Sequence, residues 1–301
     1  MFHVKTAQMK ETLGGGRMIV LRDGRSAGAG TGGKYPILNV VYSYAPVRLA
    51  ATAVCRRQVM RLAGRYADLR FSTVHIKKFA RRNHIPLNRR YRSFNDFFSR
   101  ERTDVHFPAA PEALGSPCQS YVSAWEGIRA DRVIQAKGSY YRLEELLSGA
   151  APADRFEGGV CVCCRLDTNH YHRVHFIDDG IIAVERSVAG LYDSVQPVAL
   201  RKKRRLYAKN HRLVSLCRTD QFGTVAMVEV GALFVGSIVR TAPLQEPVPR
   251  GGVKGHFKMG GSTVLLFFEK GRVRMDEDIL WQTALGNEVV VDVGEHIGRK
   301  S

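Results

Sequence analysis

The stretch KMGGSTVLLFFEKG, residues 258–271, combines a tight turn with a buried strand. Two glycines, Gly260 and Gly261, precede Ser262, and an apolar run follows as far as Phe268. An uninterrupted apolar run bounded by glycine and charged residues is typical of a strand that is buried on both faces. The glycines also permit backbone conformations that bring the Ser262 hydroxyl onto the carbonyl of Gly261. Taken alone, the stretch is more often an ordinary turn into a strand.

Short apolar runs of the same kind recur after residue 110, separated by Gly and Asp turns. They are GGVCVCCRL (158–166), DDGIIAVERSV (178–188), RLVSLC (212–217), TVAMVEV (224–230), LFVGSIV (233–239) and EVVVDV (288–293). Strands at this spacing, with little helix between them, predict a mainly β domain with antiparallel sheets. One short helix is expected at about 143–147, ending before Gly149.

The pattern upstream of this β region is helical. In residues 48–70 the apolar positions at helical spacing are Cys55, Val59, Leu62, Tyr66 and Leu69. A separate ridge of arginines makes this a basic amphipathic helix, which is the form of an interfacial membrane anchor or of an ordinary surface helix. SFNDFFSRE (93–101) predicts a short capped helix, because Ser93 precedes Asp96 by three residues.

These patterns predict an α+β protein in three parts. Residues 1–34 are expected to be a flexible Gly-rich arm, and 35–105 a basic helical membrane-docking region. Residues 106–301 are expected to form a mainly β domain. The spelling GAGTGG (28–33) lacks the strand-then-helix frame of a dinucleotide fingerprint, so we assign it no ligand.

The basic charge is concentrated at one end of the chain. The whole protein has 46 Lys and Arg against 28 Asp and Glu, and residues 1–100 hold 20 and 4 of these. Such a segment favours an anionic partner, either a membrane surface or nucleic acid. Few aromatic residues interleave the basic ones, which disfavours nucleic acid. A solvated basic face without a specific partner remains the simpler alternative.

The cysteines and the hydropathy of the chain indicate the kind of cellular compartment to expect. The chain has 6 Cys, and the alternating Cys161 and Cys163 suit a buried strand better than a metal site. We therefore expect no metal, and a reducing compartment. Neither a signal peptide nor a transmembrane helix is expected, since the best apolar stretch contains Pro36, Pro46 and Arg48. The prediction is a peripheral protein at the cytoplasmic face of a membrane.

Two histidines stand out in YHRVHFIDDG (171–180). His172 and His175 are three residues apart, and on a strand this spacing points the two rings to opposite faces. Separate acid–base roles therefore fit the pair better than joint ligation of a metal. Two structural histidines are the alternative for this segment alone.

Together these segments resemble the phosphatidylserine decarboxylase family. The resemblance extends from about residue 60 to the C-terminus. The stretches that carry it, in family order, are SFNDFFSRE (93–101), SPC (116–118), SYYRLEELL (139–147), YHRVHFIDDG (171–180), VQPVAL (195–200), FGTVAMVEVGALFVGSI (222–238) and GHFKMGGSTVLLFFEKG (255–271). Several separated motifs in the correct order make the resemblance specific.

The resemblance implies that the chain cuts itself between Gly261 and Ser262 and that Ser262 becomes a covalent pyruvoyl group. By resemblance His175 is the base for cleavage, and His172 assists decarboxylation or reprotonation. The pyruvoyl ketone would form a Schiff base with phosphatidylserine, giving phosphatidylethanolamine and carbon dioxide. The implied partners are phosphatidylserine, an anionic membrane surface and the chain's own fragment 262–301, with self-association left open.

One position departs from the family pattern. The family places Asp-Gly after Ser-Pro-Cys, whereas here Gln119 and Ser120 follow. That Asp orients the maturation histidine in the family, and Asp178, Asp179 or Asp193 could substitute for it. The departure leaves two alternatives open beside the lipid decarboxylase. One is a non-catalytic, uncleaved lipid-surface homologue, and the other is a pyruvoyl decarboxylase of a soluble amino acid.

Overall fold

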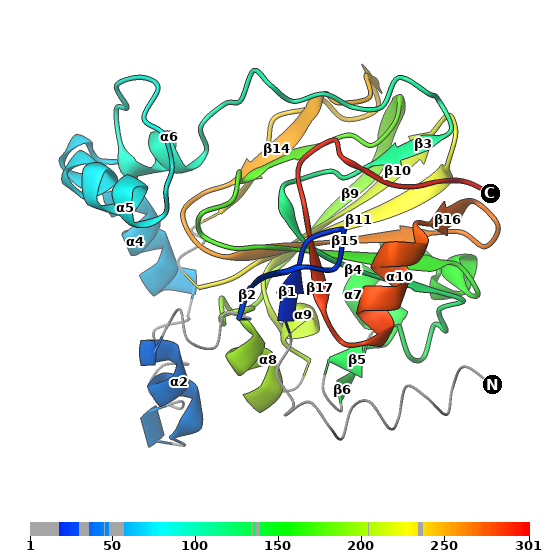
Figure 1. The fold of residues 1–301 in the computed structure, drawn as a ribbon, viewed down its shortest axis with the longest axis horizontal. Helices are drawn as coiled ribbons and strands as arrows, with labels where there is room; N and C mark the ends of the chain where they lie inside the picture. Colours follow the sequence, from blue (N-terminus) through cyan, green and yellow to red (C-terminus); the bar gives the residue numbers. More distant parts are fainter. Residues whose placement is uncertain are drawn as a thin grey trace.

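Figure 1 shows the fold in a computed structural model, which describes residues 18–29, 36–44, 46–47, 57–133, 135–136, 139–203, 205–233 and 237–301. A large β-sheet with smaller sheets and helices packed around it forms the body of the molecule. A separate group of short helices lies at one side of this body, at the left of Figure 1. The chain therefore has the mixed α+β architecture that the sequence predicts.

The main sheet contains ten strands in the order β13-β9-β10-β11-β15-β7-β4-β17-β1-β2. Their bounds are β1 (Met18–Val20), β2 (Ser26–Ala29), β4 (Ser120–Glu126), β7 (Val160–Leu166), β9 (Gly180–Val188), β10 (Arg212–Thr219), β11 (Gly223–Gly231), β13 (Pro247–Val248), β15 (Ser262–Phe268) and β17 (Glu288–Val291). The neighbours pair antiparallel, apart from the parallel pair β1 and β17. Strand β15 lies in the interior of the sheet, between β11 and β7.

Strand β15 is buried on both faces, as its apolar sequence predicts. Val264 and Leu266 belong to one hydrophobic core, and Leu265 and Phe267 belong to a second core on the opposite face. Helix α10 (Glu277–Ala284) contributes Ile279 to the first core. The second core is covered by α7 (Leu143–Leu147), η2 (Ala153–Phe156), α8 (Pro197–Lys202) and α9 (Leu206–Lys209).

Three smaller sheets complete the β structure. The first consists of β12 (Ile238–Arg240), β14 (Val253–Phe257) and β8 (Arg173–His175). The second consists of β16 (Val273–Met275), β18 (His296–Lys300) and β3 (Ala113–Gly115), and the third of β5 (Gln135–Ala136) and β6 (Ser139–Tyr140). The first of these matters for function, because β8 carries the histidine motif.

The helices at the side of the body form what we call the helical module. It comprises α4 (Arg57–Asp68), η1 (Arg70–His75), α5 (Ile76–Arg82) and α6 (Phe94–Phe98). Ala67, Ile76, Ala80, Ile85, Phe94, Phe97 and Phe98 make its own small core. The predicted cap is confirmed, since Ser93 accepts a hydrogen bond from the Asp96 amide at 3.1 Å. The expected helix over 48–70 is described only from Arg57 onward.

The N-terminal segment differs from the expected loose arm where the structure describes it. Residues 18–29 form β1 and β2, which extend the main sheet beyond β17. The segment becomes ordered there because the edge of β17 offers backbone groups to β1 and because Ile19 and Val20 are buried. The remainder of the arm lies outside the described residues. Helix α2 (Pro36–Ser43) also departs from a pure membrane-docking role, because its Tyr42 is buried in the second core.

Candidate active site around Ser262

Ser262 is the first residue of β15 and is completely buried. The sheet fixes it from both sides, with Gly231 of β11 and Leu166 of β7 as its register partners. The turn before it requires glycine at one position, because Gly260 has φ of +134°. Gly261 has room for a side chain, since the nearest atom to an added Cβ would be 3.8 Å away. The unusual backbone conformation is therefore one residue earlier than the expected cleavage bond.

His172 is the histidine that meets Ser262. Its Nδ1 lies 3.4 Å from the Ser262 Oγ, and its Nε2 lies 2.9 Å from the carbonyl oxygen of Asp167. A carbonyl oxygen only accepts, so Nε2 carries the proton and Nδ1 is left as an acceptor facing the serine hydroxyl. Phe98 stacks on the imidazole with ring centroids 4.2 Å apart. Burial lowers the pKa of His172 to about 3, so the ring is neutral.

His175 lies in a different environment, as the spacing of the pair predicts. Its Nδ1 donates to the Gly251 carbonyl oxygen at 2.8 Å, and its Nε2 accepts from the Tyr171 hydroxyl at 3.2 Å. Burial also lowers the pKa of His175. Among the described residues, the hydrogen bonds of its imidazole ring go to these two groups and not to Ser262. The expected contact between the cleavage base and the nucleophile is thus made by His172 instead.

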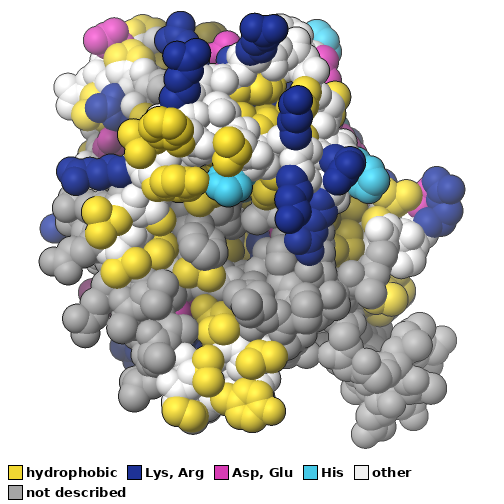
Figure 2. Space-filling view, turned by 90° about the vertical axis from the view of Figure 1, so that its left-hand side faces the viewer, with side chains coloured by type: hydrophobic (Ala, Val, Ile, Leu, Met, Phe, Trp, Pro, Cys, Tyr) yellow, Lys and Arg dark blue, Asp and Glu magenta, His cyan; other side chains and the backbone are white. Residues whose placement is uncertain are grey.

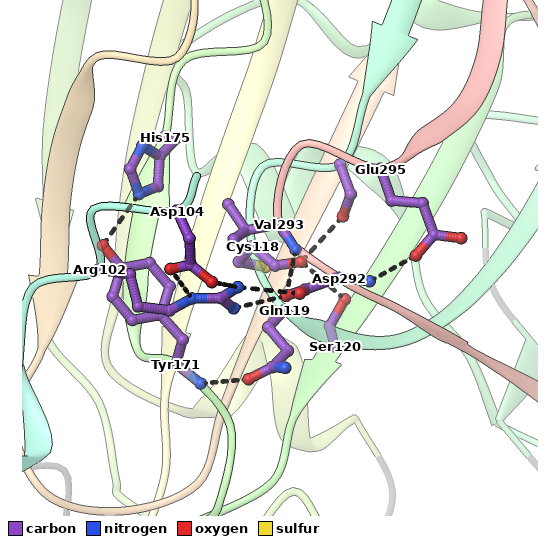
Figure 3. A network of polar contacts seen from close by, with 11 residues as sticks. Arg102, Asp104, Cys118, Gln119, Ser120, Tyr171, His175, Asp292, Val293 and Glu295 are labelled. Carbon is purple, nitrogen blue, oxygen red and sulfur yellow. Dashed lines mark hydrogen bonds and ion pairs between the residues drawn. The ribbon is translucent and has the colours of Figure 1, made fainter. Parts of the chain in front are cut away.

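Gln119 occupies the position where the sequence pattern expects an acid, and Figure 3 shows its surroundings. Its Oε1 accepts a hydrogen bond from the Tyr171 amide at 2.8 Å. The side chain thereby holds the residue whose hydroxyl contacts His175, without touching the imidazole. A backbone carbonyl, that of Gly251, sets the tautomer of His175.

The three suggested substitute carboxylates are engaged elsewhere. Asp178 forms an ion pair with Arg250 at 2.8 Å, and Asp179 accepts from the Arg250 amide at 2.9 Å. Asp193 is paired with Lys203 at 2.7 Å. These three carboxylates therefore bind groups other than the imidazole of His175, and their contacts do not support the idea that one of them replaces the missing acid.

Comparison with known proteins shows which family the chain belongs to. A sequence model described as phosphatidylserine decarboxylase matches residues 94–299. The chain belongs to the phosphatidylserine decarboxylase family. A phosphatidylserine decarboxylase proenzyme from Clostridium tetani is 38% identical over 272 residues, which are 88% of this chain and 92% of that protein. A proenzyme from Desulfitobacterium hafniense is 40% identical over 266 residues, covering 84% of this chain and 87% of the relative.

Three groups near the two histidines were not identified from the sequence. Tyr171 directly precedes His172 in the family motif, yet only the structure shows its hydroxyl against His175. Phe98 belongs to the small core of the helical module, and its ring also packs on the imidazole of His172. The Gly251 carbonyl gave no signal, because a backbone acceptor leaves no trace in side-chain chemistry.

Buried ion pairs flank β15 on both sides. Arg165 of β7, the register partner of Thr263, donates to Glu288 with an Nε–Oε1 distance of 2.9 Å. Glu229 of β11 pairs with Lys254, and both of these side chains are fully buried. Breaking one partner of such a pair leaves an uncompensated buried charge, which is strongly destabilising. The pairs therefore hold the strands on either side of Ser262 in place.

The described residues also show whether a metal site or a membrane-spanning helix is present among them. Within the described ranges, His, Cys, Asp and Glu side chains form no group of three or more arranged for a metal ion. None of the helices in these ranges is long and apolar enough to cross a bilayer.

Proposed function

We propose that this member of the phosphatidylserine decarboxylase family matures by cutting itself between Gly261 and Ser262 and then decarboxylates phosphatidylserine. The observation that carries the proposal is Ser262 itself, which is completely buried at the start of an interior strand of the main sheet and follows two glycines. Oγ attacks the Gly261 carbonyl carbon, the amide bond breaks, and an ester forms. Loss of the Ser262 Cα proton then breaks the Cβ–O bond and releases the upstream chain as a carboxylate.

The dehydroalanine left at residue 262 adds water and loses ammonia, which yields the pyruvoyl group. This group supplies an electrophilic ketone that takes up the substrate amine and draws electrons from the bond to the carboxylate. The site fits such a group, because residue 262 begins an interior strand of the sheet and is enclosed on all sides. His172 is the side chain in place to move a proton at this position.

The small fragment is expected to stay with the large one after cleavage. Residues 262–301 include β15 and β17, which are interior strands of the main sheet. Their backbone hydrogen bonds to β11, β7 and β4 do not depend on the Gly261–Ser262 bond. The mature protein is therefore a complex of fragments 1–261 and 262–301.

We assign the two histidines the separate roles that the family pattern implies, with His175 as the base for cleavage and His172 acting in decarboxylation. The pKa of about 3 makes His172 a poor proton acceptor near neutral pH, in spite of its contact with Ser262. His175 keeps an accepting Nε2, which Tyr171 occupies in the uncut chain. The opposite assignment, based on the 3.4 Å contact alone, is the competing one.

A non-catalytic, uncleaved homologue is the second candidate function. The observation that favours it is the amide at residue 119 together with a carbonyl, and no carboxylate, as the described partner of the His175 Nδ1. In a serine–histidine–acid triad, replacing the acid by its amide costs about 10⁴ in rate. Cleavage happens once per molecule, so even a large loss in rate is compatible with maturation.

Intact mass measurement of the purified protein tests between these candidates. We expect fragments 1–261 and 262–301, with the smaller one blocked at its N-terminus by the pyruvoyl group. Gln119→Asp should speed cleavage, by up to about 10⁴-fold, because a carboxylate beside Tyr171 and His175 favours proton uptake by the imidazole. Gln245→Asp adds the same charge at an exposed position and should leave the rate unchanged.

Wild type that stays intact and inactive for days, and that Gln119→Asp fails to rescue, would establish the non-catalytic alternative. Rescue by Gln119→Asp would show instead that the scaffold is competent and that the missing acid limits maturation.

We further propose that the helical module docks on an anionic phospholipid surface. The apolar side chains that are exposed on α4, η1 and the residue between them are Val59, Leu62, Tyr66, Leu69, Phe71 and Val74. Phe71 is 80% exposed and Val74 is 72% exposed, so this face of the module is not packed on the protein itself. Figure 2 shows hydrophobic side chains on this side of the molecule with lysines and arginines around them.

The helical module contacts the chain segment that precedes Ser262. Asp68 at the end of α4 pairs with Lys258 at 2.9 Å, and Asn95 accepts from the Met259 amide at 3.0 Å. Both contacts reach the segment that runs directly into Ser262. A lipid headgroup at the module therefore lies next to the chain segment that leads to the buried site.

Vesicle sedimentation tests the docking proposal. Binding to vesicles with anionic lipid should weaken as salt rises, because the Debye length shrinks from about 10 Å at 0.1 M to about 3 Å at 1 M. The double variant Leu62→Ser, Phe71→Ser should bind roughly tenfold or more weakly, since it removes apolar area that would enter the interface. Trp281→Ser removes a large exposed apolar side chain on α10, outside the helical module, and serves as the control. Equal, salt-independent binding to neutral vesicles would refute the electrostatic part.

A further inference from the structure

Arg100 carries a buried guanidinium nitrogen without a partner. Its Nη1 is inaccessible to solvent and makes no hydrogen bond to any of the described residues. The neighbouring arginines are satisfied, since Arg102 pairs with Asp292 at 2.7 Å and Arg173 pairs with Glu101 at 2.9 Å. Burying a cationic donor without a partner costs free energy, so such a group normally has a ligand in its functional state.

Arg100 follows a helix that packs against the candidate site. It follows α6 directly, two residues after Phe98, whose ring stacks on His172. Its Cζ lies 5.6 Å from the centroid of the Phe97 ring. Burial is the main cause of the lowered pKa of His172, and the charge of Arg100 contributes to it. His172 in turn contacts Ser262, so Phe98 and His172 connect the end of α6, which Arg100 follows, to the residue that would carry the ketone.

An anionic group of the substrate is the natural ligand for this cation. Phosphatidylserine offers two such groups, its carboxylate and its phosphodiester. The carboxylate loses its charge as carbon dioxide leaves, and a guanidinium fixed on it would stabilise the starting state more than the transition state. The phosphodiester keeps its charge throughout the reaction. A cation on the phosphodiester therefore binds substrate without opposing the chemistry.

We propose that the Arg100 guanidinium binds the phosphodiester of the phosphatidylserine headgroup and so positions the serine moiety at residue 262. This inference rests on the proposed function. Arg100 lies two residues after the end of α6, the last helix of the module whose α4 and η1 carry the exposed apolar face. A phosphodiester held there would have its acyl chains directed to the membrane and its amino acid directed inward. Substrates with an amine and a carboxylate but no phosphodiester would lack this contact.

The test compares Arg100→Met and Arg100→Lys with the wild type, and uses Arg218→Met as the control. Arg218 is an exposed arginine of β10, outside the site. Cleavage is first checked by intact mass. Then kcat and KM are measured with short-chain phosphatidylserine, and inhibition is measured with short-chain phosphatidylethanolamine. The product keeps the phosphodiester and lacks the carboxylate, so it reports the phosphodiester contact alone.

For Arg100→Met we expect normal cleavage and a kcat within a few-fold of wild type. The KM for the substrate and the inhibition constant of the product should rise together, on the order of 10- to 100-fold, as for loss of a hydrogen bond to a charged group. Arg100→Lys should fall between Arg100→Met and wild type, because it keeps the charge but not the planar fork.

A rise in KM with an unchanged product inhibition constant would overturn the proposal in favour of a carboxylate contact. Unchanged values for both would overturn it altogether. If neither Arg100 variant cuts itself while Arg218→Met does, the residue serves folding and the proposal falls. A wild type that is uncut and inactive would instead refute the proposed function. Calorimetric binding of the short-chain product to wild type and to Arg100→Met then still decides whether Arg100 contacts the phosphodiester.

Discussion

Replacing Ser262 by alanine is expected to leave the protein as a single uncut chain without decarboxylase activity. The substitution removes the only atom that we propose to attack the Gly261 carbonyl, so no ester forms and no pyruvoyl group can arise. The change is sterically mild, because it removes one oxygen from a buried residue at the start of β15. Denaturing electrophoresis and intact mass measure the cleavage, and carbon dioxide release measures the activity.

A matched control comes from the same sheet. Ser123 of β4 is also buried, and its hydroxyl lies 3.5 Å from the Asn287 carbonyl oxygen, away from His172. Ser123→Ala should therefore mature and turn over like the wild type. If Ser262→Ala still separated into two fragments at the same bond, the hydroxyl-attack mechanism would be wrong. If Ser262→Ala stayed whole but remained fully active, the pyruvoyl group would not be the catalytic group.

The two histidines should give opposite phenotypes, and the losses should again be large. We expect His175→Ala to remain uncut, because the proposed base for cleavage is gone. His172→Ala should be cut but should lose decarboxylation by about 10²- to 10⁴-fold, the usual contribution of a positioned acid or base. Cleavage is followed by intact mass over hours to days, and activity is measured only on the fraction that has been cut.

The structure makes this comparison decisive, because it brings His172 and not His175 to the Ser262 hydroxyl. If His172→Ala stayed uncut while His175→Ala matured, the 3.4 Å contact would be the productive one and the two roles would be exchanged. His172→Ala also removes the ring on which Phe98 of α6 stacks. His172→Gln therefore serves as a second variant that keeps more of the packing against Phe98. If both histidine variants cut and turned over normally, neither assignment would stand.

Much of the fold was predictable because it follows from local patterns. The apolar runs after residue 110 predicted strands, and β7, β9, β10, β11, β15 and β17 lie within or overlap those runs. The capping pattern at Ser93 and the short helix Leu143–Leu147 were likewise confirmed. These features depend on hydrophobic periodicity and on hydrogen bonds between near neighbours, and both are determined by residues that are close together in the sequence.

The segment 18–29 was not predictable in this way. Its apolar run is only three residues long, and it becomes a strand through pairing with β17, more than 250 residues later, and through burial of Ile19 and Val20. The amphipathic stripe on α4 shows the same limit. Its spacing was visible in the sequence, but only the structure shows that Leu62 and Tyr66 face outward instead of packing on the body.

By itself, the sequence determined the family, the α+β class, Ser262 at the start of a buried strand, and the two histidines as residues with different surroundings. Only the tertiary structure decided that His172 faces Ser262, that Gln119 accepts from the Tyr171 amide, and that Arg100 Nη1 is buried without a hydrogen bond to the described residues. The physical reason is separation along the chain. Ser262 and His172 are 90 residues apart, and their contact depends on how the sheets and α6 pack together, which no local pattern encodes.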